Sequence, residues 1–300
     1  MSVFKQKYRR YTGELKGRWH KIWAIAKSTF KVQYRGRKVF LLTPLGALLS
    51  FVFTLVLFFG AIFAGSVTNL FFGLFEMLDI AMYTIVFMSF SSGLLFLPLV
   101  FFAVFNSGTI ANDKKNNSLA LYMSRPLDKI DYILGKFIAT LMVNSFVTIL
   151  PWLLFLVTYT LLGGLTGSQI IDIIWVYPAT LGIGLVIDLF FSSIIVYFSS
   201  LSDRSFLAGL MLILVILIPS TIADTLAITL NLDFLNYFSV SALINATTFL
   251  FFGKPSDDLG LGVPVWDINI NSWVSLTILL AITAVCFILT VINLYKEEID

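Results

Sequence analysis

The chain of 300 residues is far more apolar than a water-soluble protein of this length: 58% of its residues are hydrophobic, 12% are charged, and its net charge is +3. A soluble fold does not need so much apolar surface, so the composition predicts an integral membrane protein. One histidine, His20, and one cysteine, Cys286, leave no intrachain disulfide and too few ligands for a metal or redox centre. We therefore expect no cofactor bound to this chain.

The first 38 residues form a basic segment, with 12 lysine and arginine side chains against one acid, Glu14. In its second half, apolar and basic side chains recur with the period of a helix and fall on separate faces. The apolar face holds Trp19, Ile22, Trp23, Ala26 and Phe30, and the basic face holds Lys27, Lys31 and Arg35.

We expect this amphipathic helix to lie in the inner interface of the bilayer, with its aromatic rings in the acyl boundary and its lysines on anionic headgroups. Two roles stay open: an anchor that orients the chain, or an elbow that works against a cytoplasmic partner. Nucleic-acid binding is not expected, because the segment leads directly into an apolar run and contains no recognisable nucleic-acid module.

Six apolar runs follow that are long enough to cross a bilayer. A helix needs about 20 residues to cross a hydrocarbon core of about 30 Å. The runs cover residues 39–64, 80–105, 137–162, 173–201, 205–222 and 272–295. The sequence therefore predicts an all-α polytopic membrane protein, in which residues 39–300 form a six-helix transmembrane domain after the basic segment 1–38.

Lysine and arginine are distributed very unevenly between the predicted spans. Of the 20 basic residues, 19 lie in segment 1–38, loop 106–136, turn 202–204 or the C-terminal end, and only Lys254 lies on the other side. The positive-inside rule places these four segments in the cytoplasm. We therefore predict a multi-pass protein of the cell membrane with both ends inside.

The cytoplasmic loop 106–136 carries an apolar patch, a break at Pro126 and a new helix that begins near Asp128. Asp128 is a candidate N-cap, with Asp131 in the place of the usual Glu or Gln of a capping box. Apolar side chains exposed on a cytoplasmic loop indicate a protein partner. The patch consists of Leu119, Leu121, Tyr122 and Met123.

The chain lacks the motifs of several enzymes. Gly135-Lys136 is not a phosphate-binding loop, because Ile130 stands where its first glycine would be, and neither H-E-x-x-H nor G-x-S-x-G occurs. We therefore predict that the chain is not an enzyme. Its energy source would be another subunit or an ion gradient.

Along the loop stand, in order, Asp113, Asn117-Ser118-Leu119, Ser124-Arg125-Pro126 and Leu134-Gly135-Lys136. This order resembles that in the membrane permeases of exporter-type ABC transporters of the second class, a family that includes the permease associated with nitrous oxide reductase maturation. Those chains carry Glu, Gly-Thr-Leu, Ser-[Lys/Arg]-Pro and Leu-[Gly/Ala]-Lys at these places. Here Asp replaces the Glu and Asn-Ser-Leu replaces Gly-Thr-Leu. The basic segment before the first span and the predicted six-helix arrangement also fit the family.

The resemblance implies that residues 112–122 couple the chain to a separate ATPase subunit, which would bind ATP. It also implies a second permease copy, identical or homologous, and a shared translocation path. The alternative is that the loop only joins two helices. The residues expected to contact the ATPase are Asp113, Leu119, Leu121, Tyr122 and Arg125.

Asp188 is the one clear carboxylate predicted near the middle of a span, with Ser192 one turn later. A charged Asp there costs about 2.5 to 3.5 kcal/mol, so we expect its carboxyl to face the bundle interior, protonated or hydrogen-bonded. It could be a functional site or polar glue between helices. It is also the only candidate for the alternative function, an ion-coupled transporter or membrane scaffold that works without an ATPase.

A long segment, 223–270, separates the last two spans on the external side. Within it, residues 238–252 are apolar enough to dip into the membrane but too few to cross it. Asn245-Ala246-Thr247 is a glycosylation sequon, which has meaning only if the asparagine is exposed.

Overall fold

A computed structural model describes residues 17–34, 96–118, 128–146, 148–150, 174–253 and 270–296, with single positions at 153, 156, 157, 160, 167, 170 and 171. Within these residues every regular element is a helix, and no strand is present. The predicted span 39–64 lies outside them, as do most of span 80–105 and much of the second half of span 137–162. Arg35, Leu119, Leu121, Tyr122 and Arg125 also lie outside the described residues.

Three of the described helices are long and apolar enough to cross a membrane: α11 (Val176–Leu201), α12 (Ser205–Leu230) and α14 (Ser272–Lys296). They coincide with the predicted spans 173–201, 205–222 and 272–295. The expected class, an all-α membrane protein, is confirmed at this level. The count of six spans stays a prediction.

α12 is longer than predicted. The apolar run predicted a span that ends at residue 222, but the helix continues past Asp224 to Leu230. It ends where Asn231 adopts a left-handed conformation (φ 51°, ψ 43°) and the Leu232 N–H donates to the Ala227 carbonyl. Asparagine tolerates this conformation and commonly ends helices. The backbone geometry at Asn231 therefore ends the helix.

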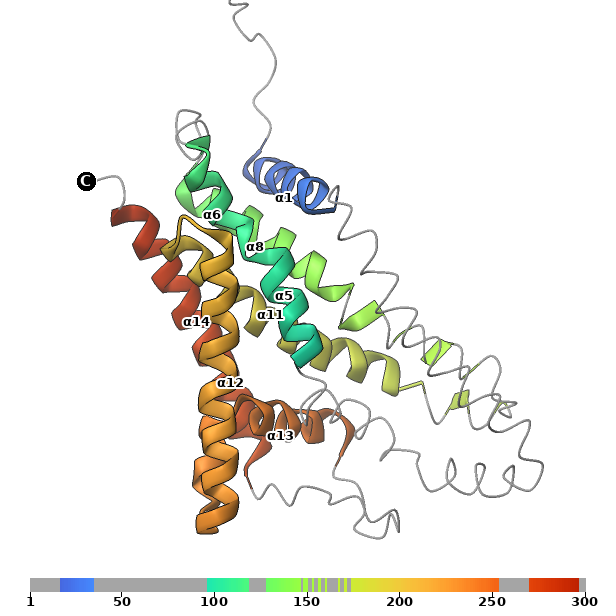
Figure 1. Ribbon diagram of the computed structural model, residues 1–300. Helices are drawn as coiled ribbons and strands as arrows, with labels where there is room; N and C mark the ends of the chain where they lie inside the picture. The colour runs from blue at the N-terminus through green and yellow to red at the C-terminus, as the bar shows by residue number, and fades with distance from the viewer. Residues whose placement is uncertain are drawn as a thin grey trace, which may run out of the picture.

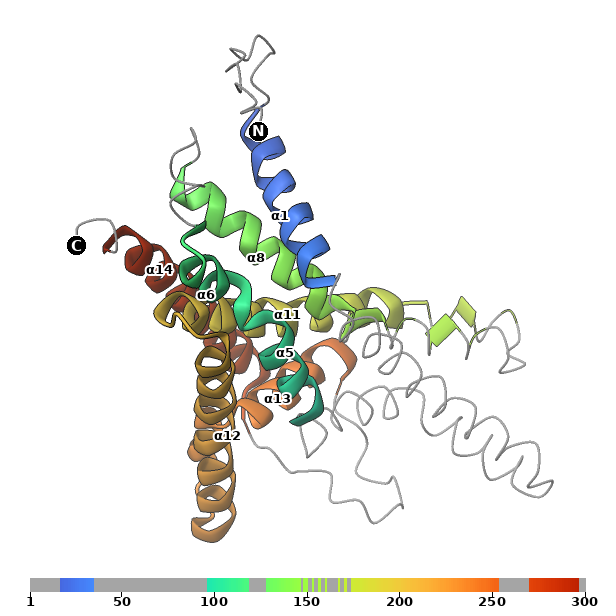
Figure 2. The same cartoon turned by 45° about the horizontal axis from the view of Figure 1, so that its top comes forward.

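The shorter helices are α1 (Arg18–Tyr34), α5 (Phe96–Asn106), α6 (Gly108–Lys115), α8 (Lys129–Ser145) and α13 (Val240–Phe252), with a 3₁₀ turn, η1 (Asp233–Phe238). In Figure 1, α6 continues from α5, α1 lies beside α8, and α13 lies across the direction of α12. The rotated view in Figure 2 keeps α1 against α8. Most of the apolar run 238–252 thus forms a short helix, Val240–Phe252, and its first residue, Phe238, ends the 3₁₀ turn. Whether this helix enters the membrane stays a prediction.

α11 is the central helix, and α5, α6, α8, α12, α13 and α14 all contact it. Aromatic rings fill the space between α5 and α11, where the Phe102 and Phe191 ring centroids are 4.9 Å apart. α12 and α14, in contrast, expose most of their apolar side chains, among them Phe206, Ile218, Val285 and Ile288. Such exposure is unfavourable in water and ordinary in lipid.

Candidate functional site

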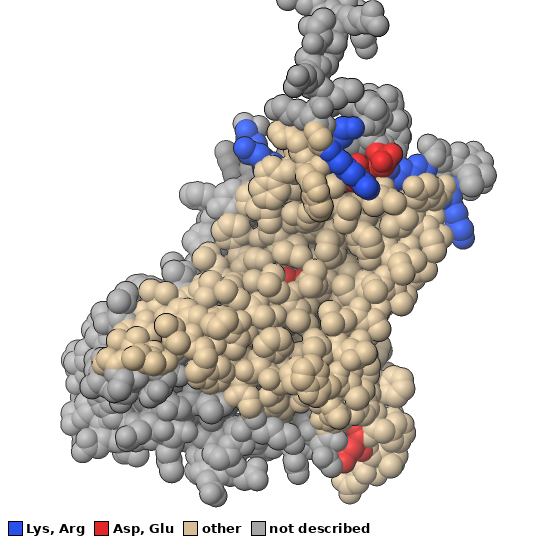
Figure 3. All heavy atoms as spheres, turned by 180° about the vertical axis from the view of Figure 1, so that it is seen from behind, with Lys and Arg blue, Asp and Glu red and all other residues tan. Residues whose placement is uncertain are grey.

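Described residues of all four segments predicted to be cytoplasmic lie at one end of the helix bundle. We call this the basic end: Arg18 of segment 1–38, residues 113–118 and 128–136 of loop 106–136, residues 199–205 around the turn 202–204, and residues 293–296 at the C-terminal end. The Asn293 side-chain amide donates to the Ser200 carbonyl (2.7 Å), and Lys129 Nζ donates to the Leu294 carbonyl (3.3 Å) and lies over the Tyr295 ring. Figure 3 shows Lys and Arg side chains gathered at one end of the visible face. The sidedness of the membrane itself stays a prediction.

The Ser199 hydroxyl of α11 holds the first turn of α6. The helix is interrupted at Ser107, between α5 and α6. Ser199 Oγ accepts from the N–H groups of Ile110 (2.9 Å) and Ala111 (3.0 Å) and donates to the Ser107 carbonyl (2.7 Å). Ser199 is fully buried, and its hydroxyl gives the Ile110 N–H, one of the first helical N–H groups without an intrahelical partner, an acceptor away from water. Lys114 Nζ also donates to the Ser200 carbonyl, which fixes the other end of α6.

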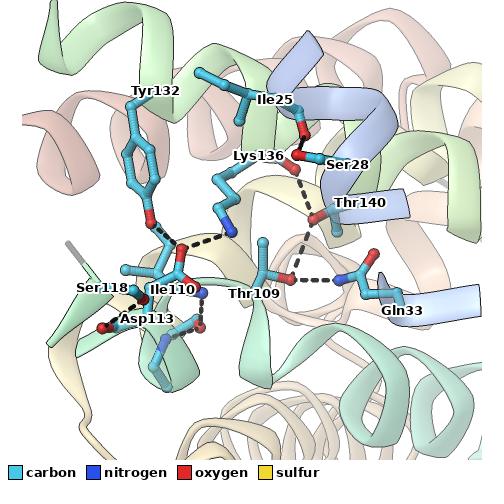
Figure 4. Close-up of polar contacts among 12 residues, drawn as sticks. Ile25, Ser28, Gln33, Thr109, Ile110, Asp113, Ser118, Tyr132, Lys136 and Thr140 are labelled. Atoms are coloured by element: carbon cyan, nitrogen blue, oxygen red, sulfur yellow. Dashed lines mark hydrogen bonds and ion pairs between the residues drawn. The ribbon is translucent and has the colours of Figure 1, made fainter. Parts of the chain in front are cut away.

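Asp113 points from α6 into the bundle and not toward solvent (Figure 4). Its Oδ2 lies 2.7 Å from Lys136 Nζ and accepts a hydrogen bond of 2.7 Å from the Tyr132 hydroxyl, both on α8. The Lys136 side chain is 5% exposed and that of Asp113 18%. Burial lowers the pKa of Lys136, and the charge of Asp113 opposes that shift. This carboxylate therefore joins α6 to α8; its predicted contact with an ATPase stays a prediction.

α8 begins as predicted, but its capping differs. Asp128 has extended geometry (φ −71°, ψ 143°) immediately before Lys129, so it occupies the N-cap position, but its side chain makes no capping bond. The expected capping box is wrong, because the Asp131 carboxylate accepts instead from Arg18 Nε at 2.5 Å. That hydrogen bond and charge raise the pKa of Arg18. Asp131 therefore ties α1 to α8.

α1 packs on α8 through a glycine. A Cβ added at Gly135 would lie 2.8 Å from Ile25 Cβ and 3.0 Å from the Ile22 carbonyl oxygen, so only glycine allows this approach. Ile22, Ile25 and Ala26 are buried in the contact.

The apolar face of α1 is only partly covered by the rest of the described structure. Trp19 is 77% and Trp23 53% exposed, whereas Phe30 is partly buried, with its ring centroid 5.9 Å from that of Phe146. Lys27 and Lys31 are exposed. α8 therefore covers part of the apolar face predicted to meet lipid, and the two tryptophans remain outside beside the lysines.

The C-terminal end of α6 contains a turn that usually needs glycine. Asn117 has φ 52°, a left-handed conformation, and its N–H donates to the Lys114 carbonyl. Asparagine is among the few residues that adopt this conformation readily. The Ser118 hydroxyl then donates to the Asp113 carbonyl (3.1 Å). The chain thus leaves α6 through a defined turn immediately before residues 119–127.

Asp188 lies deep in the bundle, as predicted, with none of its side chain exposed. Its Oδ2 lies 2.7 Å from the Ser145 hydroxyl oxygen and its Oδ1 lies 2.6 Å from the Thr148 hydroxyl oxygen, both hydrogen-bond distances. One turn along, Asn144 Nδ2 donates to Ser192 Oγ (2.9 Å). These contacts join α8 and the residues after it to α11.

Two asparagines extend this polar contact toward α5. Asn106 Nδ2 donates to Asn144 Oδ1 at 2.6 Å, and both residues are fully buried. Thr109 donates to the Asn106 carbonyl (2.6 Å) and accepts from Gln33 of α1 (2.9 Å). Ser199, Asn106 and Asn144 were not singled out from the sequence. Each stands first in a pair of polar residues at the end of an apolar run or inside one, and such a pair is the available signal.

Among the residues that the structure describes, no three His, Cys, Asp or Glu side chains come together to hold a metal ion. Asn245 lies within α13 and is 4% exposed, so the sequon is not accessible in this fold. Comparison of the chain with protein-family models and with curated proteins gives no match.

Proposed function

We propose that this chain is the permease subunit of an ABC transporter, and that residues 112–125 receive the motion of a separate ATPase subunit. The main support for the proposal is that the residues on both sides of 119–127 are bonded to neighbouring helices. A connection that only joins two helices has no need of such anchoring, whereas one that transmits force does.

The anchors reach several helices. On the α6 side, Lys114 bonds to α11, and Asp113 pairs with Lys136 of α8. On the α8 side, Lys129 bonds to α14, and Asp131 bonds to Arg18 of α1. A displacement of the loop would therefore act on α1, α8, α11 and α14 together, because packed interiors transmit strain instead of absorbing it.

The local geometry also supports the resemblance to these permeases. Asn117 stands where those chains have glycine, and it adopts the left-handed conformation that glycine supplies most easily. The substitution therefore preserves the turn. Gly135, in the matching Leu-Gly-Lys, admits α1 at close range.

The partners follow from this proposal. ATP would be bound by the ATPase subunit, and a second permease copy, identical or homologous, would complete the path. The exposed apolar sides of α12 and α14 are available to that copy and to lipid. The cell membrane is the expected location, with both chain ends in the cytoplasm.

The proposal is tested by a substitution that places one charge in the apolar patch of the loop. Leu121→Asp would place a carboxylate in a contact that excludes water, so we expect it to release the ATPase or uncouple hydrolysis from transport while the chain still inserts into the membrane. Lys115→Ala, which changes an exposed side chain, is the matched control and should have little effect. Co-purification with a phosphate-loop ATPase and its hydrolysis rate are the measurements. If the Leu121→Asp chain keeps both the partner and full transport, the loop is only a linker and the proposed coupling role is wrong.

The second candidate, an ion-coupled transporter or scaffold without an ATPase, depends on Asp188. Within the described part of the chain, its polar partners are the hydroxyls of Ser145 and Thr148, which also suits a structural role. Asp188→Asn keeps the shape of the side chain and removes its charge. If this variant transports normally, the ion-coupled alternative loses its candidate; if it assembles but does not transport, that alternative gains support.

A further inference from the structure

The contact between Asp188 and its two hydroxyl partners has more close oxygen pairs than hydroxyl protons. Ser145 Oγ lies 2.7 Å from Asp188 Oδ2 and 2.9 Å from the Leu141 carbonyl oxygen. Thr148 Oγ1 lies 2.6 Å from Asp188 Oδ1 and 3.2 Å from the Asn144 carbonyl oxygen. Each hydroxyl has one proton and can donate only once. Four close pairs therefore share two protons if Asp188 is ionised.

A third proton, on Asp188, fits this geometry better. The carboxyl then donates from Oδ2 to Ser145, which in turn donates to the Leu141 carbonyl, and Thr148 donates to Oδ1. Every hydroxyl proton and the carboxyl proton has an acceptor. In the ionised form, both hydroxyls must leave their carbonyls, and two hydrogen bonds alone would have to balance a full buried charge.

Among the described residues, no cation lies against Asp188 to compensate that charge. The helices packed against α8 and α11 carry these charged or titratable side chains: Arg18, His20, Lys21, Lys27 and Lys31 on α1; Asp113, Lys114 and Lys115 on α6; Asp224 on α12; and Cys286, Tyr295 and Lys296 on α14. α8 and α11 themselves add Lys129, Asp131, Tyr132, Lys136, Tyr177 and Tyr197, and α5 and α13 add none. None of these described side chains hydrogen-bonds or ion-pairs with Asp188.

A bound metal ion suits the site less well than a proton. The oxygen separations of 2.6 and 2.7 Å are those of O–H···O hydrogen bonds, which already occupy both carboxyl oxygens. We propose that Asp188 is a proton-binding site, whose carboxyl is neutral at neutral pH and donates a hydrogen bond to Ser145 across the contact between α8 and α11.

This inference does not rest on the proposed function. The proton holds α8 and α11 together without a buried charge, and it can leave only to a water molecule that enters when these helices separate. Protonation of Asp188 thus favours the closed contact and its ionisation favours an open, hydrated one.

Infrared spectroscopy of the full chain in lipid vesicles at neutral pH tests the proposal, because a protonated carboxyl has a C=O band separate from those of carboxylates. We expect such a band in the unaltered protein, shifted when aspartate is labelled with ¹³C at its side-chain carboxyl. Ser145→Ala should shift the band, because it removes the hydrogen-bond partner, and Asp188→Asn should abolish it. Asp233→Asn, at an exposed carboxylate, is the control and should leave it unchanged.

The absence of a ¹³C-sensitive band in the unaltered protein would overturn the proposal, and so would a band that Ser145→Ala leaves in place without a shift. The spectra of the unaltered protein and of Ser145→Ala decide the question even if Asp188→Asn fails to accumulate in the membrane.

Discussion

At the scale of single residues, the basic end depends on a few polar side chains with little access to water. Asp113 and Lys136 are the clearest case, since their side chains are 18% and 5% exposed and 2.7 Å apart. Removal of one partner from such a pair leaves the other charge uncompensated, whereas removal of both can be nearly neutral. The contribution of the pair is thus best measured with single and double variants.

We expect Lys136→Met to lower the free energy of unfolding by about 3 kcal/mol, because it isolates the Asp113 carboxylate. The double variant Asp113→Asn with Lys136→Met should recover most of that loss. Thermal unfolding in detergent measures both, with Lys115→Ala as the exposed control. Equal destabilisation in the single and double variants would show that packing of the lysine stem, and not its charge, is what matters.

Ser199→Ala should destabilise the chain by about 1 to 3 kcal/mol, the usual cost of leaving buried backbone groups unpaired. Ser193→Ala is a close control, since Ser193 is also buried on α11 but donates only to the Phe190 carbonyl of its own helix. The same unfolding assay compares the two. Matching effects would mean that the hydroxyl of Ser199 does not hold α6.

At the scale of helices, the contact between α1 and α8 depends on the absence of a side chain at Gly135. Gly135→Ala places a methyl group against Ile25 and the Ile22 carbonyl oxygen, so α1 should detach or shift. The reporter is a cysteine at Ala26, which is fully buried, in a chain whose Cys286 has been replaced by serine. We expect maleimide to label this cysteine several-fold faster after Gly135→Ala.

Gly17→Ala is the control for that experiment, because a Cβ at Gly17 meets nothing within 4 Å. If Gly135→Ala leaves the labelling rate of the Ala26 cysteine unchanged, α1 does not depend on close approach to α8.

Helix positions were largely predictable, because hydrophobic length and turn chemistry are local properties of the sequence. α11 and α14 begin and end within a few residues of the predicted spans, and α8 starts directly after Asp128. α12 was underestimated, because the helix continues eight residues beyond the apolar run that ends at residue 222. Pairings across the fold were not predictable: Asp131 lies 113 residues from Arg18, and Ser199 lies 89 from Ile110. No local pattern specifies such partners.

At the scale of the molecule, the segments predicted to be cytoplasmic lie together at one end, joined by the contacts of Ser200 with Lys114 and Asn293. The positive-inside rule then predicts one orientation for the whole bundle, with this end in the cytoplasm. A cysteine at Lys115 should react with an impermeant reagent only from the cytoplasmic side, and a cysteine at Asp258 only from outside. Labelling of both from the outside would contradict the six-span arrangement.

Photo-cross-linking from the loop in intact membranes tests most directly whether residues 112–125 contact an ATPase. A photoreactive amino acid at Leu121 should form an adduct with a phosphate-loop ATPase, identified by mass spectrometry, and the same amino acid at Thr229, exposed near the other end of α12, should form none. An adduct with lipid alone at position 121, or the same ATPase adduct from both positions, would contradict the assignment of this loop as the coupling segment of a permease.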